Sequence, residues 1–286
     1  MTRPRPAVLM ILAVAGAMSA AAQLPTFSVR TEEVRVDVLV TDHGKPVRGL
    51  TSADFEVRDS GVRQQIEFAS FEQIPINAIL AFDLSGSVAG ERLDHLRGAG
   101  RALLDNLKKD DRAALVIFSH ILALGSGLTT DLGRVRLALD QAQPFGNTSV
   151  IDASYAGLIV GESDAGRPLL IVFSDGLDTS SWLTSDEVLD TAKRGHAVVY
   201  SVSAGQLPNM TFLRDLSKFT GGSVFEVEST KNLGAVFLGI LEEFRQRYLV
   251  TYEPRGVPKD GWHRIEVRVK GRNFTVKARP GYLKGL

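Results

Sequence analysis

Two nearly continuous apolar runs stand out in the middle of the chain, at Ile74–Phe82 and Pro168–Phe173. Runs without polar alternation are typical of strands that are buried on both faces, as in parallel sheets covered by helices. Between the two runs, Leu93, Leu96 and Leu103 recur at helical spacing. The hydrophobic pattern therefore predicts buried strands separated by amphipathic helices.

The same alternation continues through residues 74–247. Further strands are expected at RAALVIFSHI, at the short edge segment LALGSGLTTD, at VVYSVSAG and at SVFEVE, and a long closing helix at TKNLGAVFLGILEEFRQR. Thr184, with Glu187 three residues later, forms a capping-box signature that marks the start of another helix. Regular βα alternation predicts an α/β fold with a doubly wound, mostly parallel sheet.

Both flanks of this α/β unit show a different pattern, in which apolar residues alternate with polar ones. Before the unit it is seen at Val34–Val40, where Asp37 is one of the polar positions, and at Phe55–Arg58. After the unit it is seen at Tyr248–Tyr252 and in the segments RIEVRVK and FTVKA. A period of two predicts strands with one face in water, and Gly271–Asn273 predicts a turn that joins the last two segments in a hairpin.

Neither flank has enough strands to bury a core of its own. Together the flanks supply about seven strands, enough for a small β-sandwich. We therefore expect the α/β unit, residues 74–247, to be inserted in a small β-sandwich formed by both chain ends. Residues 23–73 would form the N-terminal β segment, and residues 248–286 the C-terminal β segment that packs with it.

The first 22 residues have the pattern of a secretory signal peptide. A basic start with Arg3 and Arg5 precedes the apolar stretch AVLMILAVAGAM and a small-residue cleavage site at Ala20–Ala22. The alternative is an N-terminal membrane anchor, but the apolar stretch is short for a membrane span. We expect the mature chain to begin at Gln23 and to be secreted, periplasmic or on the cell surface.

Composition narrows the possible functions. Hydrophobic residues make up 44% of the 286 residues, enough to bury a sizeable core, and there is no cysteine for disulfides or thiolate metal sites. Formal net charge is zero, basic residues are spread along the chain, and no later segment is long and apolar enough to span a membrane. Charge therefore does not favour a nucleic acid partner, and the oligomeric state stays open.

Five oxygen-bearing side chains stand in loops of the α/β unit: Asp83, Ser85, Ser87, Thr148 and Asp175. The two aspartates directly follow the two apolar runs, and ligands of open α/β sheets bind beyond the carboxyl ends of the strands. Oxygen donors with few negative charges suit Mg²⁺ or Mn²⁺ and leave a coordination position for a group from outside the protein. These residues are the candidate metal ligands.

The motif D-x-S-x-S at Asp83, Ser85 and Ser87, followed by the distant Thr148 and Asp175, resembles the metal-ion-dependent adhesion site of the von Willebrand factor type A family. Order and rough spacing also agree. The resemblance implies that the two serines and the threonine touch the metal directly and that the aspartates act largely through bound water. It also implies that an Asp or Glu carboxylate of a protein partner fills the remaining position.

Plainer roles exist for the same residues. Asp, Ser and Gly are ordinary turn residues, and Thr148 or its neighbour Ser149 could cap the helix that follows. Asp178 could tune the site or simply belong to a turn. Trp182 could be an exposed anchor for a partner or pack under its loop, and His120 could lie near the metal or act as a cap.

The flanks carry a looser resemblance. The segments VDVLVTDHGKPVRGLTSADFEVRDSG, near the start, and YLVTYEP to KARPGYL, at the end, are similar to those of a bacterial group of secreted proteins related to the von Willebrand factor type A family. The resemblance then covers nearly all of the chain after residue 22.

Three functions compete. The first is a secreted, non-enzymatic adhesion module that captures an acidic group of a partner through Mg²⁺. The second is a structural envelope or assembly protein with an incidental metal site, joined through exposed strand edges. The third is phosphoryl transfer with Asp83 as nucleophile, but phosphatases of the haloacid dehalogenase type carry a second aspartate where this chain has Ser85. Because catalytic motifs such as G-x-S-x-G and H-E-x-x-H are also missing, we expect no enzyme.

Overall fold

A computed structural model describes residues 33–71, 74–163, 166–204 and 210–285. The expected signal peptide, residues 1–22, lies outside the described residues, and its cleavage stays a prediction.

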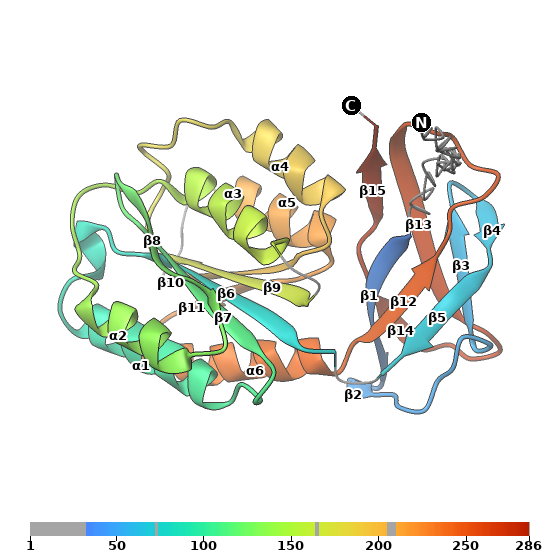
Figure 1. Ribbon diagram of the computed structural model, residues 1–286, viewed down its shortest axis with the longest axis horizontal. Helices are drawn as coiled ribbons and strands as arrows, with labels where there is room; N and C mark the ends of the chain where they lie inside the picture. Colours follow the sequence, from blue (N-terminus) through green and yellow to red (C-terminus); the bar gives the residue numbers. More distant parts are fainter. Residues whose placement is uncertain (1–32, 72–73, 164–165, 205–209, 286) are drawn as a thin grey trace, which may run out of the picture. The chain divides into compact units, whose positions relative to one another are not determined.

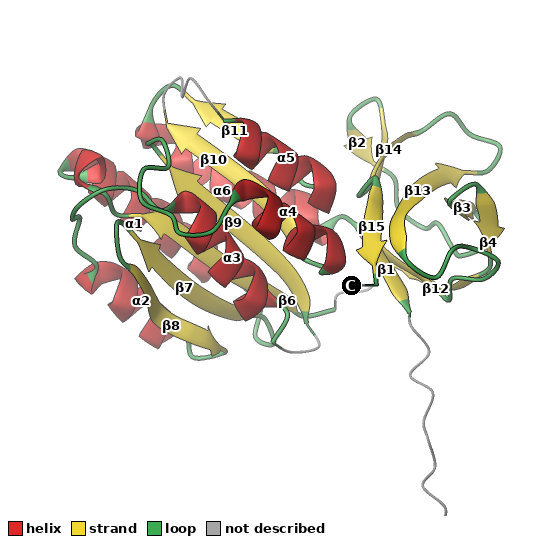
Figure 2. Cartoon of the chain, turned by 90° about the horizontal axis from the view of Figure 1, so that it is seen from above, coloured by secondary structure: helices red, strands yellow, loops and turns green. Residues whose placement is uncertain are grey.

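The apolar runs of the α/β unit form a six-stranded sheet in the order β11-β10-β9-β6-β7-β8 (Figures 1 and 2). Its strands are β6 Ile76–Asp83, β7 Arg112–Phe118, β8 Leu122–Thr129, β9 Arg167–Ser174, β10 Val198–Ala204 and β11 Val224–Val227. Neighbours pair in parallel, except that β8 pairs with β7 antiparallel. The order reverses between β6 and β9, so the prediction of a doubly wound, mostly parallel sheet is confirmed.

Helices cover both faces of this sheet (Figure 2). One face packs against α1 (Glu91–Asp105), α2 (Leu132–Gln141) and α6 (Leu233–Arg245), and the other against α3 (Val150–Gly161), α4 (Ser185–Arg194) and α5 (Thr211–Thr220). Short 3-10 turns, η1 (Gly86–Val88) and η2 (Thr230–Asn232), precede α1 and α6. Successive strand residues such as Ile79 and Leu80 belong to the two different cores, which explains why the strands show no polar alternation.

The predicted capping box begins α4. The Thr184 hydroxyl accepts a hydrogen bond from the Glu187 backbone N–H, and the Glu187 carboxylate accepts one from the Thr184 N–H at 2.8 Å. Two of the backbone donors that a helix start leaves unpaired are thereby satisfied.

Both chain ends meet in a β-sandwich. Its strands are β1 Val34–Asp42, β2 Lys45–Pro46, β3 Phe55–Asp59, β4 Val62–Gln64, β5 Ile66–Ser70, β12 Tyr248–Tyr252, β13 Gly261–Val269, β14 Thr275–Lys277 and β15 Gly281–Lys284. One sheet has the order β14-β1-β12-β5, with β2 beside β1, and the other has the order β15-β13-β3-β4. The pair β1–β12 is antiparallel, with Val36 opposite Val250. The predicted insertion of the α/β unit in a sandwich is confirmed, whereas domain boundaries at residues 73 and 247 stay a prediction.

The predicted hairpin at Gly271–Asn273 is wrong. Strand β13, before the turn, pairs with β3 and β15, whereas β14, after it, pairs with β1 in the other sheet. Val269 and Val276, one from each strand, still reach the same sandwich core. A turn signal specifies where the chain reverses, and burial of alternate residues is satisfied equally well when the second strand crosses to the facing sheet.

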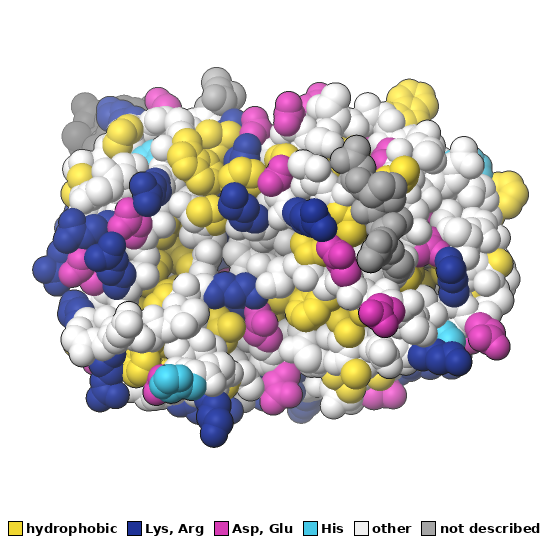
Figure 3. All heavy atoms as spheres, turned by 180° about the vertical axis from the view of Figure 1, so that it is seen from behind, with side chains coloured by type: hydrophobic (Ala, Val, Ile, Leu, Met, Phe, Trp, Pro, Cys, Tyr) yellow, Lys and Arg dark blue, Asp and Glu magenta, His cyan; other side chains and the backbone are white. Residues whose placement is uncertain are grey.

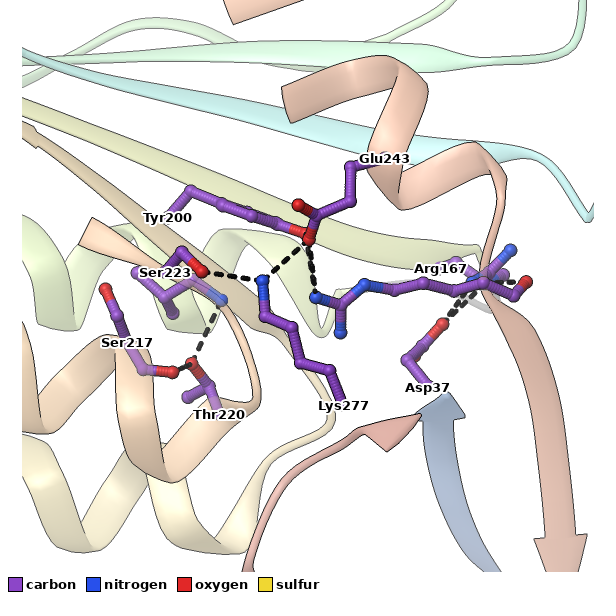
Figure 4. Close-up of polar contacts among 10 residues, drawn as sticks. Asp37, Arg167, Tyr200, Ser217, Thr220, Ser223, Glu243 and Lys277 are labelled. Carbon is purple, nitrogen blue, oxygen red and sulfur yellow. Dashed lines mark hydrogen bonds and ion pairs between the residues drawn. The ribbon is translucent and has the colours of Figure 1, made fainter. Parts of the chain in front are cut away.

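The prediction that β1 has one face in water is also wrong. Asp37 is only 9% exposed, and its carboxylate accepts hydrogen bonds from the guanidinium of Arg167, which is 5% exposed and begins β9 (Figure 4). The Arg167 side chain also lies over the Phe244 ring, 4.7 Å from its centroid. A strand of the sandwich is thereby joined to the central sheet by a buried ion pair.

A second polar cluster joins α6 to the sandwich. Glu243 accepts hydrogen bonds from Lys277 of β14 at 2.7 Å and from the Tyr200 hydroxyl at 2.6 Å (Figure 4). It also accepts one from Arg247 at 3.0 Å. Although burial by itself raises the pKa of the Glu243 carboxyl, the bonds from Lys277 and Tyr200 outweigh it and lower that pKa. Glu243 is therefore held as an anion between these groups.

Charges elsewhere are mixed. On the face shown in Figure 3, Lys and Arg side chains are interspersed with Asp and Glu.

Among the helices of the described segments, none has the length and apolar character needed to cross a membrane.

We predict that Asp37→Asn lowers the free energy of unfolding by about 3 kcal/mol, because it leaves the Arg167 charge buried without its partner. Urea denaturation checks this. Asp105→Asn is the control: its ion pair with Arg136, at 2.6 Å, is largely exposed, so its loss should cost less than about 1 kcal/mol. Equal costs for the two variants would contradict the structural importance of the buried pair.

Candidate metal centre

The candidate site begins at the carboxyl end of β6, where Asp83 is fully buried. One carboxylate oxygen accepts the backbone N–H of Ser85 at 2.8 Å, and the other accepts the hydroxyl of Ser174 at 2.6 Å. Ser174 ends the neighbouring strand β9, directly after Phe173, which lies opposite Phe82. The buried carboxylate is therefore held rigidly by groups from both strands.

The two motif serines connect Asp83 to Asp175. The Ser85 and Ser87 hydroxyls lie 3.0 Å apart, and Ser87 donates to Oδ1 of Asp175 at 2.6 Å. The Asp175 side chain has no exposed surface. Four of the five predicted site residues thus form a continuous chain of oxygen groups.

Thr148 reaches the same place from the loop before α3. A Cβ added to Gly176 would lie 3.0 Å from the Thr148 hydroxyl, so that hydroxyl borders the residue after Asp175. The N-cap position of α3 belongs to Ser149, and its hydroxyl donates to the Ser119 carbonyl at 2.6 Å. Thr148 is therefore not the residue at the N-cap of α3. All five predicted residues lie close together at one end of the sheet.

The loop before Thr148 passes close to His120 at Gly146. Gly146 has φ of +73°, and a Cβ at that residue would collide with the imidazole of His120. The His120 ring packs against that of Phe145, with centroids 4.9 Å apart and planes tilted by 59°, and Phe145 donates its N–H to the Leu84 carbonyl at 2.6 Å. The exposed His120 ring therefore packs against the loop that borders the motif.

Arg92, in the first turn of α1, was not singled out by the sequence. Its guanidinium donates to Oδ2 of Asp175 at 2.7 Å, and the arginine side chain is 53% exposed. The two oxygens of Asp175 are thus engaged by Ser87 and Arg92. No motif position marks Arg92, because only the fold brings α1 next to the end of β9.

The loop after Asp175 is braced against the start of α3. The Asp178 carboxylate accepts the N–H of Ile151 at 3.0 Å and both the N–H and the hydroxyl of Ser181. The Thr148 carbonyl accepts the backbone N–H groups of residues 179 and 180. Asp178 is therefore a loop-bracing residue, and the same contacts position Thr148.

Burial makes ionisation of the Asp83 carboxyl unfavourable. Desolvation raises the pKa of its carboxyl from 3.8 to about 6, against the opposing hydrogen bonds from Ser174 and Ser85, and the nearby Asp175 charge adds to the rise. A buried carboxylate of this kind gains when a cation is placed beside it. The site therefore has an electrostatic preference for a bound cation.

The donor set fits a hard divalent cation, because it consists of two carboxylates and three hydroxyls. Within the described segments, no group of three or more His, Cys, Asp or Glu residues is arranged to hold a metal. A metal at this place would therefore depend on the serine and threonine hydroxyls, as the motif predicts.

Comparison with known proteins agrees with the fold. The profile of the von Willebrand factor type A domain matches residues 77–238, more than half of the chain. The chain belongs to this family.

Among proteins of known sequence, the chain is 25% identical over 169 residues to inter-alpha-trypsin inhibitor heavy chain H2 of Sus scrofa, and 24% identical over 186 residues to heavy chain H6 of Homo sapiens. These matches cover 54% and 58% of this chain but only 18% and 14% of the relatives. The chain thus matches a small part of each relative's length.

Among solved structures, the fold is similar to proximal thread matrix protein 1 from the mussel byssus, whose metal-ion-dependent adhesion site (MIDAS) motif is occupied by zinc. The TM-score is 0.55 at 14% identity, and the match covers 65% of this chain and 49% of that one. It is also similar to the vWF domain of the type V pili tip protein Mfa5 from Porphyromonas gingivalis, at a TM-score of 0.50 and 14% identity, covering 60% and 95%. At these identities the likeness concerns the fold.

We predict a distinctive pH dependence for the metal-free protein, held in chelator. Well below pH 3.8 the Asp83 carboxyl is protonated in both the folded and the unfolded state. Between pH 3.8 and about 6 the unfolded state ionises while the folded state keeps its proton, so the stability of the folded wild type falls as pH rises through this range. The stability advantage of Asp83→Asn over the wild type should therefore grow between pH 4 and pH 7, by up to about 3 kcal/mol.

Denaturation at several pH values measures this difference. Asp190→Asn, at an exposed position that pairs with Lys193, is the control. A difference between Asp83→Asn and the wild type that stays constant with pH would show that burial does not shift the Asp83 carboxyl.

Proposed function

We propose that this chain is a non-enzymatic binding module that captures an acidic group of a protein partner through a divalent metal ion. Asp83, Ser85, Ser87, Thr148 and Asp175 would hold the ion, Mg²⁺ or Mn²⁺. The observation that carries the proposal is the convergence of these five oxygen-bearing side chains, from three separate loops, at one end of the sheet. The zinc at the MIDAS motif of the mussel thread protein supports a divalent ion at such a site.

The charge of the donor set explains why the partner should be acidic. Two carboxylates roughly neutralise a divalent ion, and the hydroxyls of Ser85, Ser87 and Thr148 add no further charge. The ion would keep an affinity for one more carboxylate, which a site made only of carboxylates would lack. The protein's own contribution is to hold these oxygens in place and to leave Ser87 exposed at the rim.

Catalysis is less well supported. A phosphoryl transfer with Asp83 as nucleophile would need a proton donor beside it. The side chains that hydrogen-bond the Asp83 carboxylate are Ser174 and Ser85, and serine is a poor general acid near neutral pH. A binding role uses the same residues without this requirement.

A location outside the cytoplasm is part of the proposal. It rests on the signal-like residues 1–22 and on the likeness to a thread matrix protein and a pili tip protein. The partner would then be another extracellular, periplasmic or surface protein.

A second candidate function is assembly by strand addition, with the metal site incidental. Strand β8 lies at an edge of the central sheet and exposes Leu122 and Leu124, 41% and 58% accessible. An exposed apolar edge strand can pair with another chain. Removal of the metal by a chelator would not affect such association, whereas it would abolish binding under the first proposal.

Calorimetric titration of residues 23–286 with Mg²⁺ and Mn²⁺ tests the metal site. One ion per chain should bind the wild type, and Asp83→Ala and Thr148→Ala should weaken binding at least tenfold, a typical cost of disturbing a metal site. Asp140→Ala, on the exposed face of α2, is the matched control and should bind like the wild type. Wild type that is folded and binds neither ion would refute the proposal.

Arg92 gives a second prediction. Its ion pair with Asp175 must loosen when a cation enters. Because the arginine side of this pair is exposed, Arg92→Gln should tighten Mg²⁺ binding about two- to fivefold. Arg101→Gln is the control, because Arg101 lies on the same helix and pairs with Asp140 instead. Weaker Mg²⁺ binding by Arg92→Gln would show that Arg92 supports the site rather than competing with the metal.

A further inference from the structure

Trp182 is the most exposed large apolar side chain of the described residues, at 94% accessible. An exposed side chain buries almost no apolar area, so it contributes almost nothing to folding. The alternative that Trp182 packs under its own loop is therefore wrong. Leu177, in the same loop, is 45% exposed.

The backbone that carries Trp182 is nevertheless held in place. Both oxygens of Asp152, in the first turn of α3, accept the N–H of Trp182, at 3.2 and 3.0 Å, and Oδ1 also accepts the N–H of Leu183 at 2.9 Å. The Ser181 hydroxyl accepts the N–H of Asp152 at 3.1 Å. A rigid loop that presents an exposed tryptophan loses little entropy when a partner binds to it.

The same loop is joined to the candidate metal centre. Ser180 donates its N–H to the Thr148 carbonyl at 3.1 Å, and Trp182 follows two residues later. Its Cα therefore lies no more than about 7 Å from that of Ser180. A partner that reaches the metal would therefore lie close to the loop that carries the tryptophan.

The charge around Trp182 bears on its possible occupants. From Leu177 to Ala192, the loop and most of α4, the sequence contains four acidic residues, Asp178, Asp186, Glu187 and Asp190, and the first basic residues are Lys193 and Arg194 at the far end of the helix. An anionic lipid surface would be repelled by such a segment. A protein segment, whose one carboxylate is taken by the metal, is the better match.

We propose that Trp182 is the apolar anchor of a docking surface that begins at the metal and takes an extended segment of a partner protein. This inference rests on the proposed function. The segment would present an Asp or Glu to the metal and a large apolar side chain to Trp182. Because an extended chain advances about 3.3 Å per residue, side chains about three to five positions apart in such a segment would reach groups roughly 10–16 Å apart on the surface.

A displayed library of random dodecapeptides, selected in Mg²⁺ and eluted with chelator, is the probe. We expect the selected peptides to share an acidic residue and a large apolar residue about three to five positions apart. Synthetic copies should bind Trp182→Ala about 10- to 100-fold more weakly than the wild type, as for an interface hot spot. Trp182→Phe should keep most of the affinity, and Mg²⁺ binding should be unchanged in both variants.

Leu137→Ala is the matched control, because Leu137 is 58% exposed on α2, away from the tryptophan loop. If peptides depend on Mg²⁺ and on Asp83 but bind Trp182→Ala like the wild type, the docking surface is refuted and the proposed function stands. If no peptide is enriched in Mg²⁺ over chelator, both are refuted.

Fluorescence separates a protein partner from a bilayer. The chain has two tryptophans, so Trp262→Phe leaves Trp182 as the sole reporter. Selected peptide with Mg²⁺ should shift its emission to shorter wavelength, and vesicles of phosphatidylcholine, with or without phosphatidylserine, should not. A shift with vesicles would indicate that Trp182 binds a membrane rather than a protein segment, and would overturn the inference.

Discussion

The parallel register between β6 and β9 is the constraint on which the candidate site depends. Because Phe82 lies opposite Phe173, the residues that follow, Asp83 on one strand and Ser174 and Asp175 on the other, leave the sheet side by side. Residues more than 90 positions apart thereby share hydrogen bonds that hold a fully buried carboxylate. A shift of one residue in this register would turn one of the two strands' side chains to the opposite face and separate the oxygens.

Burial of charge recurs throughout the molecule, with a different outcome in each place. Asp37 and Arg167 neutralise each other where the sandwich meets the central sheet, and Glu243 is held by Lys277 and Arg247. These pairs join the two chain ends to the α/β unit. At the candidate metal centre, Asp83 accepts its hydrogen bonds from the neutral residues Ser85 and Ser174, so its charge is the one that an incoming cation would neutralise.

Two groups near the candidate metal centre would connect metal binding to partner binding in the proposed function. Arg92 engages one oxygen of Asp175 from the exposed side, and the loop from Asp175 to Thr184 carries Trp182 on a backbone fixed by Asp152. Metal, arginine and tryptophan would thus act on one partner surface. The rigidity of the loop comes from carboxylates that accept backbone N–H groups, an interaction stronger than a neutral hydrogen bond.

The sequence by itself determined the elements, the doubly wound sheet and the set of candidate ligands, because these depend on local periodicity and on motif residues at strand ends. Buried strands, the Thr184 capping box and the sandwich strands all lie where the hydrophobic pattern indicates. Only the tertiary structure decided that β13 and β14 belong to different sheets, that Asp37 is buried against Arg167 and that Arg92 reaches Asp175. Each of these depends on which surfaces meet in space, and residues far apart in the chain carry no local signal of the neighbour they will have.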